Sequence, residues 1–426
     1  MPFESAEQYD SYQQDYPNCT FYFGQWQQTV ISNADIVIAS PGIDLEAEGI
    51  TKSVNEHCLV IGDIELFCLV NNSLSKPIKL LAVTGSNGKS TVVSLLHYLA
   101  NKLNYHCLLA GNIGEPILNI LTAGDALRND NHLPELAIIE LSSFQLETLS
   151  SMKAIAATVL NISDDHLDRH KTLTNYQAIK LNIYRQANIA VINRDDKATF
   201  SLNTTQQSLS FGTDTPAEGH FGLALVNDKQ TIMLGKKPLV STDKLALAGL
   251  HNSLNYMAAL ALGHCAGWSL AEMIAHLGGF KGLEHRCQRI FTRDNVTWVN
   301  DSKATNVGAT LAAINGLSPA LRGNKKLILI AGGDAKGSDL APLTGVLTEH
   351  VDQLITLGKD GSKLAQLVGD AIEVNSLEEA VLHAKRIAKS GDMVLLSPAC
   401  ASLDMFKNYQ QRGEVFIAAL SKTEAL

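Results

Sequence analysis

Residues 84–91, Thr-Gly-Ser-Asn-Gly-Lys-Ser-Thr, have the composition of a loop that wraps a phosphate group. They follow an apolar stretch and precede a second stretch whose apolar residues have helical spacing. The glycines and the N–H groups at the start of that helix could therefore surround an anion. Lys89 would neutralise the β- and γ-phosphates, and the hydroxyl of Ser90 would ligate Mg²⁺. The match to G-x-x-x-x-G-K-[ST] is imperfect because Val83 occupies the first glycine position. A glycine-rich turn before an ordinary helix is the alternative, but strand, Gly-Lys-Ser and helix together favour nucleotide binding.

Two further strand ends carry ionisable side chains. Glu140 ends an apolar stretch, where a carboxylate beside a phosphate loop could hold Mg²⁺ directly or through water; a buried capping glutamate is the alternative. The run 161–170 is dense in polar groups, and a hydrated loop without a function is the alternative interpretation. Within that run, His166 could ligate a second metal and Asp165 could orient it. Lys180 lies on the helical stretch that follows, and its spacing alone gives it no role.

Three loops in the last third of the chain combine small residues, hydroxyl groups and lysines, at 301–306, 331–337 and 397–402. Such loops suit a small, multiply charged anion. Tight strand-to-helix turns would explain the glycines but not Lys303 and Lys336. Cys400 could be a nucleophile, but no histidine lies near it in sequence, so a small packed residue is the better interpretation.

The elements that must position these residues alternate between strand and helix. Alternation of this kind predicts parallel sheets with helices on both faces, and ligands then bind beyond the carboxyl ends of the strands. Helical spacing is clear after the phosphate loop and at 377–389. We expect strands at 35–39, 79–84, 136–140, 156–161, 189–193, 296–300, 327–331, 353–357, 372–374 and 393–397, with a further apolar stretch at 58–61.

The chain divides into three predicted domains of an α/β protein: residues 1–68, 69–282 and 283–426. The phosphate loop lies in the second block and the small-anion loops lie in the third. Residues 210–246 carry turn signals and short alternating stretches but no motif that indicates a function.

Composition narrows the class of protein. A net charge of −9 over 426 residues argues against a nucleic-acid or membrane-surface binder, because both partners are anionic. The seven cysteines form no Cys-x-x-Cys pair, so a zinc or disulfide framework is disfavoured and a reducing compartment fits. No apolar run approaches the ~18 residues of a membrane helix. The start is polar and acidic, unlike a signal peptide. We expect a cytoplasmic protein.

Together these residues resemble one family closely, the Mur ligases of peptidoglycan synthesis, and within it the branch that adds D-glutamate. The resemblance runs from about Ala34 to Phe416. The motifs that carry it are 40–43 (SPGI), 62–67 (GDIELF), 85–90 (GSNGKS), 111–114 (GNIG), 140–147 (ELSSFQLE), 165–169 (DHLDR), 251–252 (HN), 285–286 (HR), 301–306 (DSKATN) and 397–402 (SPACAS).

The resemblance implies three domains: a Rossmann-like first domain that is truncated, a central P-loop ATPase domain and a Rossmann-like C-terminal domain. It implies ATP-dependent joining of D-glutamate to the alanyl carboxylate of UDP-N-acetylmuramoyl-L-alanine through an acyl phosphate. Two Mg²⁺ sites are implied, and a monomer is the family default.

The resemblance also assigns roles to single residues. Nucleotide contacts are implied for Gly85, Ser86, Asn87, Gly88, Lys89, Ser90, Thr91, Asn252, Asn255, Arg286 and Asp301. Metal contacts are implied for Ser90, Glu140, His166 and Lys180, with Lys180 carbamylated so that it becomes an anionic oxygen ligand. Lys303 matches a lysine near the reacting phosphate, so the catalytic set is Lys89, His166, Lys180 and Lys303. The D-glutamate pocket matches Thr305, Lys336, Ser402 and Tyr409, and the UDP-sugar site matches Gly42, Asn112 and Ser142.

Some positions depart from the family pattern. Glu284, Leu340 and Tyr409 replace a proline, an aromatic residue and a phenylalanine; for Tyr409 we expect the backbone to matter more than the ring. The chain also reaches 40–43 sooner than a first domain with a complete strand-turn-helix would, since a βαβ unit needs about 30 residues. A mis-set start or a shortened chain would explain this, as would a natural trimmed variant, and we expect weakened UDP-sugar binding.

Two other readings stay open at this point. Another ligase of the same superfamily, adding a different amino acid or acting on a folate, would share the phosphate loop, Lys180 and Arg286. A P-loop ATPase that works as a switch would need no small-anion loops in a third domain.

Overall fold

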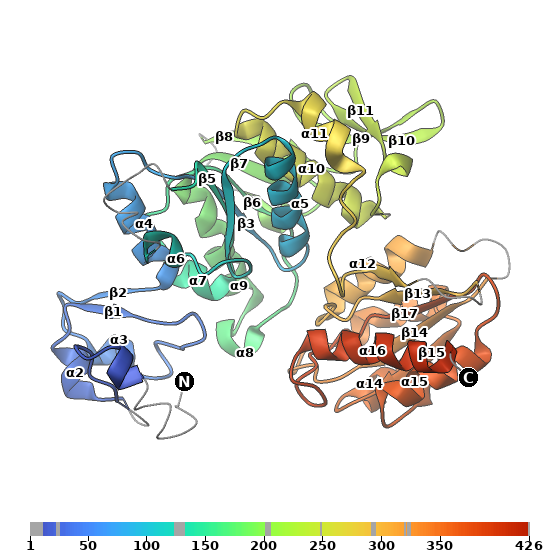
Figure 1. The fold of residues 1–426 in the computed structure, drawn as a ribbon. Helices are drawn as coiled ribbons and strands as arrows, with labels where there is room; N and C mark the ends of the chain where they lie inside the picture. Colours follow the sequence, from blue (N-terminus) through green and yellow to red (C-terminus); the bar gives the residue numbers. More distant parts are fainter. Residues whose placement is uncertain are drawn as a thin grey trace.

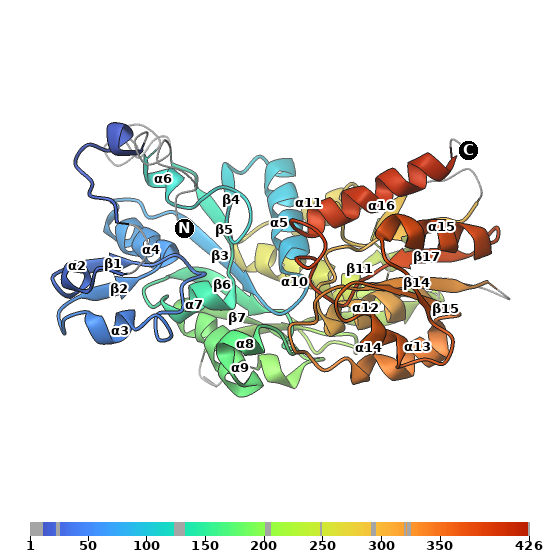
Figure 2. The ribbon, with the colours of Figure 1, turned by 90° about the horizontal axis from the view of Figure 1, so that it is seen from below.

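The computed structural model describes residues 12–22, 26–122, 133–200, 206–247, 249–290, 295–318, 321 and 325–424. The chain folds into three parts that follow each other in sequence (Figure 1). Seen from below, the central part lies between the first part and the C-terminal part (Figure 2). No helix in the described ranges has the length and apolarity needed to cross a membrane.

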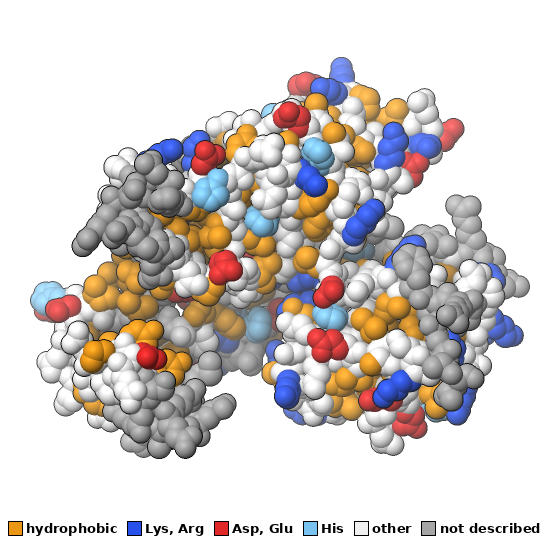
Figure 3. All heavy atoms as spheres, viewed as in Figure 1, with side chains coloured by type: hydrophobic (Ala, Val, Ile, Leu, Met, Phe, Trp, Pro, Cys, Tyr) orange, Lys and Arg blue, Asp and Glu red, His pale blue; other side chains and the backbone are white. Residues whose placement is uncertain are grey.

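The first part is small and is built on two short parallel strands. Its elements are α2 (Gln28–Ser32), β1 (Ile36–Ile38), α3 (Ile50–Ser53) and β2 (Leu59–Ile61), with Ile36 paired to Leu59. Two strands bury little surface, so Ile36, Ile38 and Leu59 are each more than 40% exposed. Apolar side chains accordingly gather on the visible surface of this part (Figure 3).

Helix α4 (Asp63–Ser73) packs against the central part. Ile64, Phe67 and Cys68 are almost fully buried in the core on one face of the central sheet. The predicted domain boundary at 68/69 falls inside this helix.

The central sheet has six parallel strands in the order β4-β5-β3-β6-β7-β8. Strand β3 lies near the middle, so the loop that follows it opens at the centre of the carboxyl edge. The strands are β3 (Lys79–Thr84), β4 (Cys107–Gly111), β5 (Leu136–Glu140), β6 (Ala154–Val159), β7 (Ala187–Asn193) and β8 (Gln207–Phe211). The predicted strands at 79–84 and 136–140 are confirmed at both ends; β4 and β8 were not predicted.

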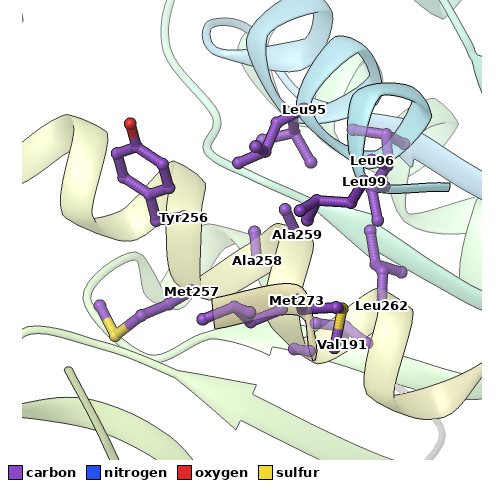
Figure 4. Packing of buried hydrophobic residues seen from close by; sticks show 14 of the residues in the cluster. Leu95, Leu96, Leu99, Val191, Tyr256, Met257, Ala258, Ala259, Leu262 and Met273 are labelled. Atoms are coloured by element: carbon purple, nitrogen blue, oxygen red, sulfur yellow. The ribbon is translucent and has the colours of Figure 1, made fainter. Parts of the chain in front are cut away.

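Two helices cover one face of this sheet, α5 (Lys89–Lys102) and α10 (Leu250–Cys265). The helical spacing after the phosphate loop reflects this packing, because Leu95, Leu96 and Leu99 of α5 point toward α10 (Figure 4). The remaining helices of the central part are α6 (Asn119–Thr122), α7 (Ser143–Glu147), α8 (Leu167–His170), α9 (Leu173–Leu181) and α11 (Leu270–Leu277), with short 3₁₀ turns η2 (Asn182–Gln186), η3 (Lys197–Thr199) and η4 (Thr242–Lys244).

The stretch 210–246, which carried no motif, contains a separate antiparallel sheet of three strands. Its strands are β9 (Phe221–Val226), β10 (Lys229–Leu234) and β11 (Lys237–Ser241), in the order β11-β10-β9. Phe221 and Ile232 are buried in the same core as α5 and α10, so this sheet extends the central part. The prediction of parallel sheets therefore does not cover this segment, where short hairpins replace helical crossovers.

The C-terminal part contains six strands in the order β12-β13-β17-β14-β15-β16. All pairs are parallel except β12 with β13. The three small-anion loops follow the three adjacent strands β13, β17 and β14, so the topology places them side by side. The strands are β12 (Gln288–Ile290), β13 (Thr297–Asn300), β14 (Leu327–Gly332), β15 (Gln353–Leu357), β16 (Ile372–Glu373) and β17 (Met393–Leu396).

The helices of this part cover both faces of its sheet, as its two apolar clusters show. They are α12 (Val307–Leu317), α13 (Thr344–His350), α14 (Gly361–Ala365), α15 (Leu377–Ile387) and α16 (Tyr409–Glu424), with the turn η6 (Ala341–Leu343). The stretch predicted as helical at 377–389 ends two residues earlier, at Ile387.

Candidate active site

The phosphate loop leaves β3 and enters α5 through Gly88, whose φ of +84° lies in the left-handed region. A Cβ atom built on Gly88 would lie 2.6 Å from Oδ1 of Asn255, so the position requires glycine on two counts. Lys89 Nζ donates to the carbonyl oxygens of Gly85 at 2.7 Å and Ser86 at 2.9 Å. Burial lowers the pKa of Lys89, while Glu140 and Asp165 partly oppose that shift.

Glu140 ends β5 beside this loop and is 1% exposed. Its Oε1 accepts a hydrogen bond from Nδ2 of Asn112 at 2.8 Å. Its Oε2 is buried and has no hydrogen-bond partner within the part of the chain that the structure describes. A buried carboxylate oxygen without a partner is costly, so this atom is suited to a cation.

Lys180 of α9 lies beneath the loop and is 1% exposed. Its Nζ donates to Gly85 O at 3.1 Å and Thr84 Oγ1 at 3.3 Å, and it sits 4.6 Å from the ring centre of Tyr176. Burial, followed by the nearby charge of Lys89, holds the pKa of Lys180 well below its usual range. No local pattern in the sequence singles out this lysine, but its burial does.

His166 occupies the N-cap position of α8 with a φ of +53°, and its ring centre lies 4.9 Å from that of Phe144. Its Nε2 lies 3.8 Å from Oδ1 of Asp165. Among the residues that the structure describes, no three His, Cys, Asp or Glu side chains cluster as metal ligands would.

The C-terminal part reaches the phosphate loop through Arg286, whose Nη2 donates to Ser90 Oγ at 2.8 Å. Asp301 is held nearby: it accepts from the Cys287 N–H at 3.1 Å and from Ser397 Oγ at 2.9 Å. Burial raises the pKa of Asp301 to about 6. These contacts bring residues far apart in sequence onto one site.

Lys303 follows Asp301, and its Nζ lies 3.9 Å from the ring centre of Tyr409. Burial, then Arg286 and Lys89, lowers the pKa of Lys303 to about 8. The backbone oxygen of Tyr409 accepts from Ser302 Oγ at 2.8 Å. Tyr409 therefore contacts this loop through its ring as well as through its backbone.

A cavity of about 320 Å³ opens between the phosphate loop, the start of α10 and helix α12. Asn252, Asn255, Arg286, Asp301 and Lys303 all line it, together with Asn87, Gly88 and Thr91 of the loop. Asn255 Nδ2 donates to Asn252 Oδ1 at 3.4 Å. Residues predicted for the nucleotide thus come from the central part and the C-terminal part to line one cavity, whereas Gly85, Ser86, Lys89 and Ser90 are not among its lining residues.

The residues predicted for the D-glutamate pocket differ in how exposed they are. Lys336 is exposed at a φ of +51°, and its N–H donates to Oδ1 of Asp334 at 2.8 Å. Ser402 is 4% exposed, and Thr305, two residues after Lys303, is half-buried. Cys400 is fully buried, and burial raises the pKa of its thiol to about 12, which agrees with a packed residue rather than a nucleophile.

The residues predicted for the UDP-sugar come from the first part and from the central part. Gly42 is exposed in a turn, with open space where a Cβ would be. Ser142 forms a capping box with Gln145 at the start of α7. Asn112 contacts Glu140, so it borders the phosphate loop as well.

Sequence reasoning missed Arg412 of α16. This side chain is 2% exposed, and it donates to Ser302 O at 2.8 Å and Cys400 O at 3.1 Å. It thereby ties together two of the small-anion loops. An arginine near the start of a C-terminal helix carries no local signal, because only the packing of α16 shows what it contacts.

The fold and the site define an ATP-dependent amide-bond ligase of the Mur ligase family, to which this chain belongs. Residues 83–263 match the Mur ligase middle domain, and residues 285–400 match the Mur ligase glutamate ligase domain.

Named relatives give more detail. A UDP-N-acetylmuramoylalanine--D-glutamate ligase of Colwellia psychrerythraea is 62% identical over 425 residues, which cover 100% of this chain and 90% of that protein. A protein of the same name from Legionella pneumophila (strain Lens) is 40% identical over 417 residues, covering 96% and 90%.

Solved structures agree in fold. MurF from Acinetobacter baumannii has a TM-score of 0.64 at 17% identity, covering 93% of this chain and 92% of its own. The UDP-N-acetylmuramate-alanine ligase MurC from Thermotoga maritima has a TM-score of 0.61 at 17% identity, covering 99% and 92%. At such low identity these likenesses concern the fold alone.

Proposed function

We propose that this chain uses ATP to join D-glutamate to the alanyl carboxylate of UDP-N-acetylmuramoyl-L-alanine, a step of peptidoglycan precursor synthesis. The observation that carries the proposal is the 62% identity, over the whole chain, to a ligase of that name. The cross-domain bond from Arg286 to Ser90 adds support, because it brings the C-terminal loops to the phosphate loop.

The reaction requires activation of a poor electrophile. The alanyl carboxylate attacks the γ-phosphorus of ATP, ADP leaves, and an acyl phosphate forms. The amine of D-glutamate then attacks the acyl carbon, and inorganic phosphate leaves as the amide bond forms. Phosphoryl transfer depends on positioning and charge neutralisation, and Lys89, Lys303 and Arg286 are the cations that converge on this site.

Mg²⁺ fits the residues beside the phosphate loop. Glu140 Oε2, which is buried and has no hydrogen-bond partner among the described residues, is a suitable ligand for a hard cation, and Ser90 in the first turn of α5 offers a hydroxyl oxygen. Bound there, Mg²⁺ would neutralise charge on the phosphate oxygens. Around His166 the donor set is smaller, so a second Mg²⁺ would rely on His166, a carbamate on Lys180 and substrate oxygens.

Carbamylation of Lys180 fits its surroundings. The reaction of an amine with CO₂ forms a carbamate and releases a proton, and it requires the neutral amine. The depressed pKa of Lys180, caused by burial and by Lys89, favours that neutral form. The product would be an anionic oxygen ligand beside Glu140 and Asp165, whose charges already act on Lys180.

We propose three domains, 1–68, 69–282 and 283–426, and assign the substrates to the remaining residues as follows. We assign the nucleotide to residues 85–91 with Asn252, Asn255, Arg286 and Asp301. D-glutamate would occupy the pocket of Thr305, Lys336, Ser402 and Tyr409. The UDP-sugar would lie near Gly42, Asn112 and Ser142. We further propose that the protein is a monomer. We also propose that it works in the cytoplasm, because seven cysteines free of disulfides favour a reducing compartment.

Phosphate release tests the proposal. The chain is incubated with ATP, Mg²⁺, UDP-N-acetylmuramoyl-L-alanine and one candidate amino acid at a time. Release stimulated by D-glutamate alone supports it. Stimulation by another amino acid, or by a folate substrate with glutamate, favours a different ligase of the superfamily. Release that no amino acid changes favours an ATPase switch.

A further inference from the structure

Asn306 belongs to the DSKATN motif, and none of the roles above includes it. It is the N-cap of α12: its Oδ1 accepts the N–H of Ala309 at 2.9 Å. An N-cap of this kind fixes the side chain, because the oxygen must stay turned toward the first helical turn. The side-chain nitrogen is therefore turned away from the helix.

That nitrogen faces the central part. Nδ2 of Asn306 lies 3.3 Å from Oδ1 of Asn87 in the phosphate loop and 3.4 Å from Oδ2 of Asp165. Asn306 is only 7% exposed, so its side chain is largely shielded from water. One amide thus caps a helix of the C-terminal part and donates to two loops of the central part.

Asn87, one of the two acceptors, is itself held in place. The Asn87 N–H donates to Oδ1 of Asn161 at 2.8 Å, and Asn161 Nδ2 donates back to Asn87 O at 3.1 Å. The surfaces also approach closely here, because a Cβ on Gly308 would lie 2.9 Å from Ser163 Oγ. A small change at Asn306 would therefore be felt across the junction.

We propose that Asn306 is a positioning residue that holds the loop bearing Lys303 in register with the phosphate loop. Its loss would leave Lys303 and Asp301 less well placed against the nucleotide. The inference rests on the proposed nucleotide site, but not on which amino acid the ligase adds.

Three variants separate the two roles of the side chain. Asn306→Ser and Asn306→Asp both keep a good N-cap acceptor. Serine is too short to reach the central part, whereas aspartate replaces the donor with an oxygen that repels Asn87 Oδ1 and Asp165. Asn306→Ala removes cap and cross-domain donor together. The measurements are the Kd for the Mg²⁺ complex of a non-hydrolysable ATP analogue, by calorimetry, and the midpoint of thermal unfolding.

We expect Asn306→Ser to raise the Kd about tenfold and Asn306→Asp to raise it further, with unfolding midpoints near that of the unmodified chain. Asn306→Ala should raise the Kd and also lower the midpoint. In an Asp165→Asn background, Asn306→Asp should raise the Kd by a smaller factor, because one repulsive carboxylate is gone.

The inference is overturned if Asn306→Ser and Asn306→Asp bind the analogue like the unmodified chain. It is also overturned if Asn306→Asp raises the Kd by the same factor in the Asp165→Asn background as in the unmodified chain, since the effect would then arise within the C-terminal part. An unmodified chain that binds no analogue would overturn the nucleotide site itself, together with this inference.

Discussion

The phosphate end and the acceptor end of the site differ in how firmly the fold holds their lysines. At the phosphate end, Lys89 and Lys180 donate to backbone oxygens of one loop, and Lys180 is almost completely buried. At the acceptor end, Lys336 is exposed and is fixed through its backbone N–H alone among the hydrogen bonds described for it. A preorganised cluster suits charge that develops during phosphoryl transfer, whereas an exposed lysine suits recognition of a small carboxylate.

Lys89→Ala should give the largest effect and test the phosphate end directly. Removing this cation leaves the γ-phosphate less neutralised, so turnover should fall on the order of 1,000-fold or more. The rate of ADP formation measures it. Lys102→Ala, exposed at the far end of the same helix, is the matched control. Turnover retained in Lys89→Ala would remove the proposed role of this residue.

Lys180→Ala should lower turnover by roughly 100-fold, because a metal-orienting anion is lost. If a carbamate acts there, acetate or formate should restore part of the rate by supplying a carboxylate in the space left behind. The exposed Lys153→Ala is the control and should need no rescue. A large loss without any restoration would indicate that the lysine acts through its packing instead.

Lys336→Ala should separate the acceptor end from the phosphate end. Loss of a charged hydrogen bond to a carboxylate should raise the KM for D-glutamate by about 10- to 100-fold while that for ATP stays nearly constant. The exposed Lys389→Ala serves as the comparison. Equal effects on both Michaelis constants would place Lys336 outside the acceptor pocket.

Lys303 joins the two ends and should give a smaller, pH-dependent effect. Its pKa is lowered to about 8, first by burial and then by Arg286 and Lys89, so its charge is lost as the pH rises through about 8. Because kcat/KM reports the free enzyme, kcat/KM for ATP should decline above that pH. Lys303→Arg, which stays charged, should move the decline to higher pH. An unchanged profile would assign the decline to another group.

Much of the fold could be predicted because its signals are local. The strands at 79–84, 136–140 and 353–357 were predicted with the bounds observed, since short apolar runs of buried parallel strands end at polar residues. The three small-anion loops were also recognised from their strand ends. By contrast, the antiparallel sheet of β9, β10 and β11 was missed, because its alternation is short and its packing on α5 and α10 is not local.

The sequence by itself determined the phosphate loop, the carboxylate at the end of β5 and the polar ends of β13, β14 and β17. Each depends on residues adjacent along the chain, and local spacing specifies them. Only the tertiary structure decided that Lys180 is buried beneath the loop, that Arg412 binds two strand-end loops and that Arg286 and Asn306 reach the central part. Burial and contacts between residues far apart in sequence depend on how sheets and helices pack, which no local pattern encodes.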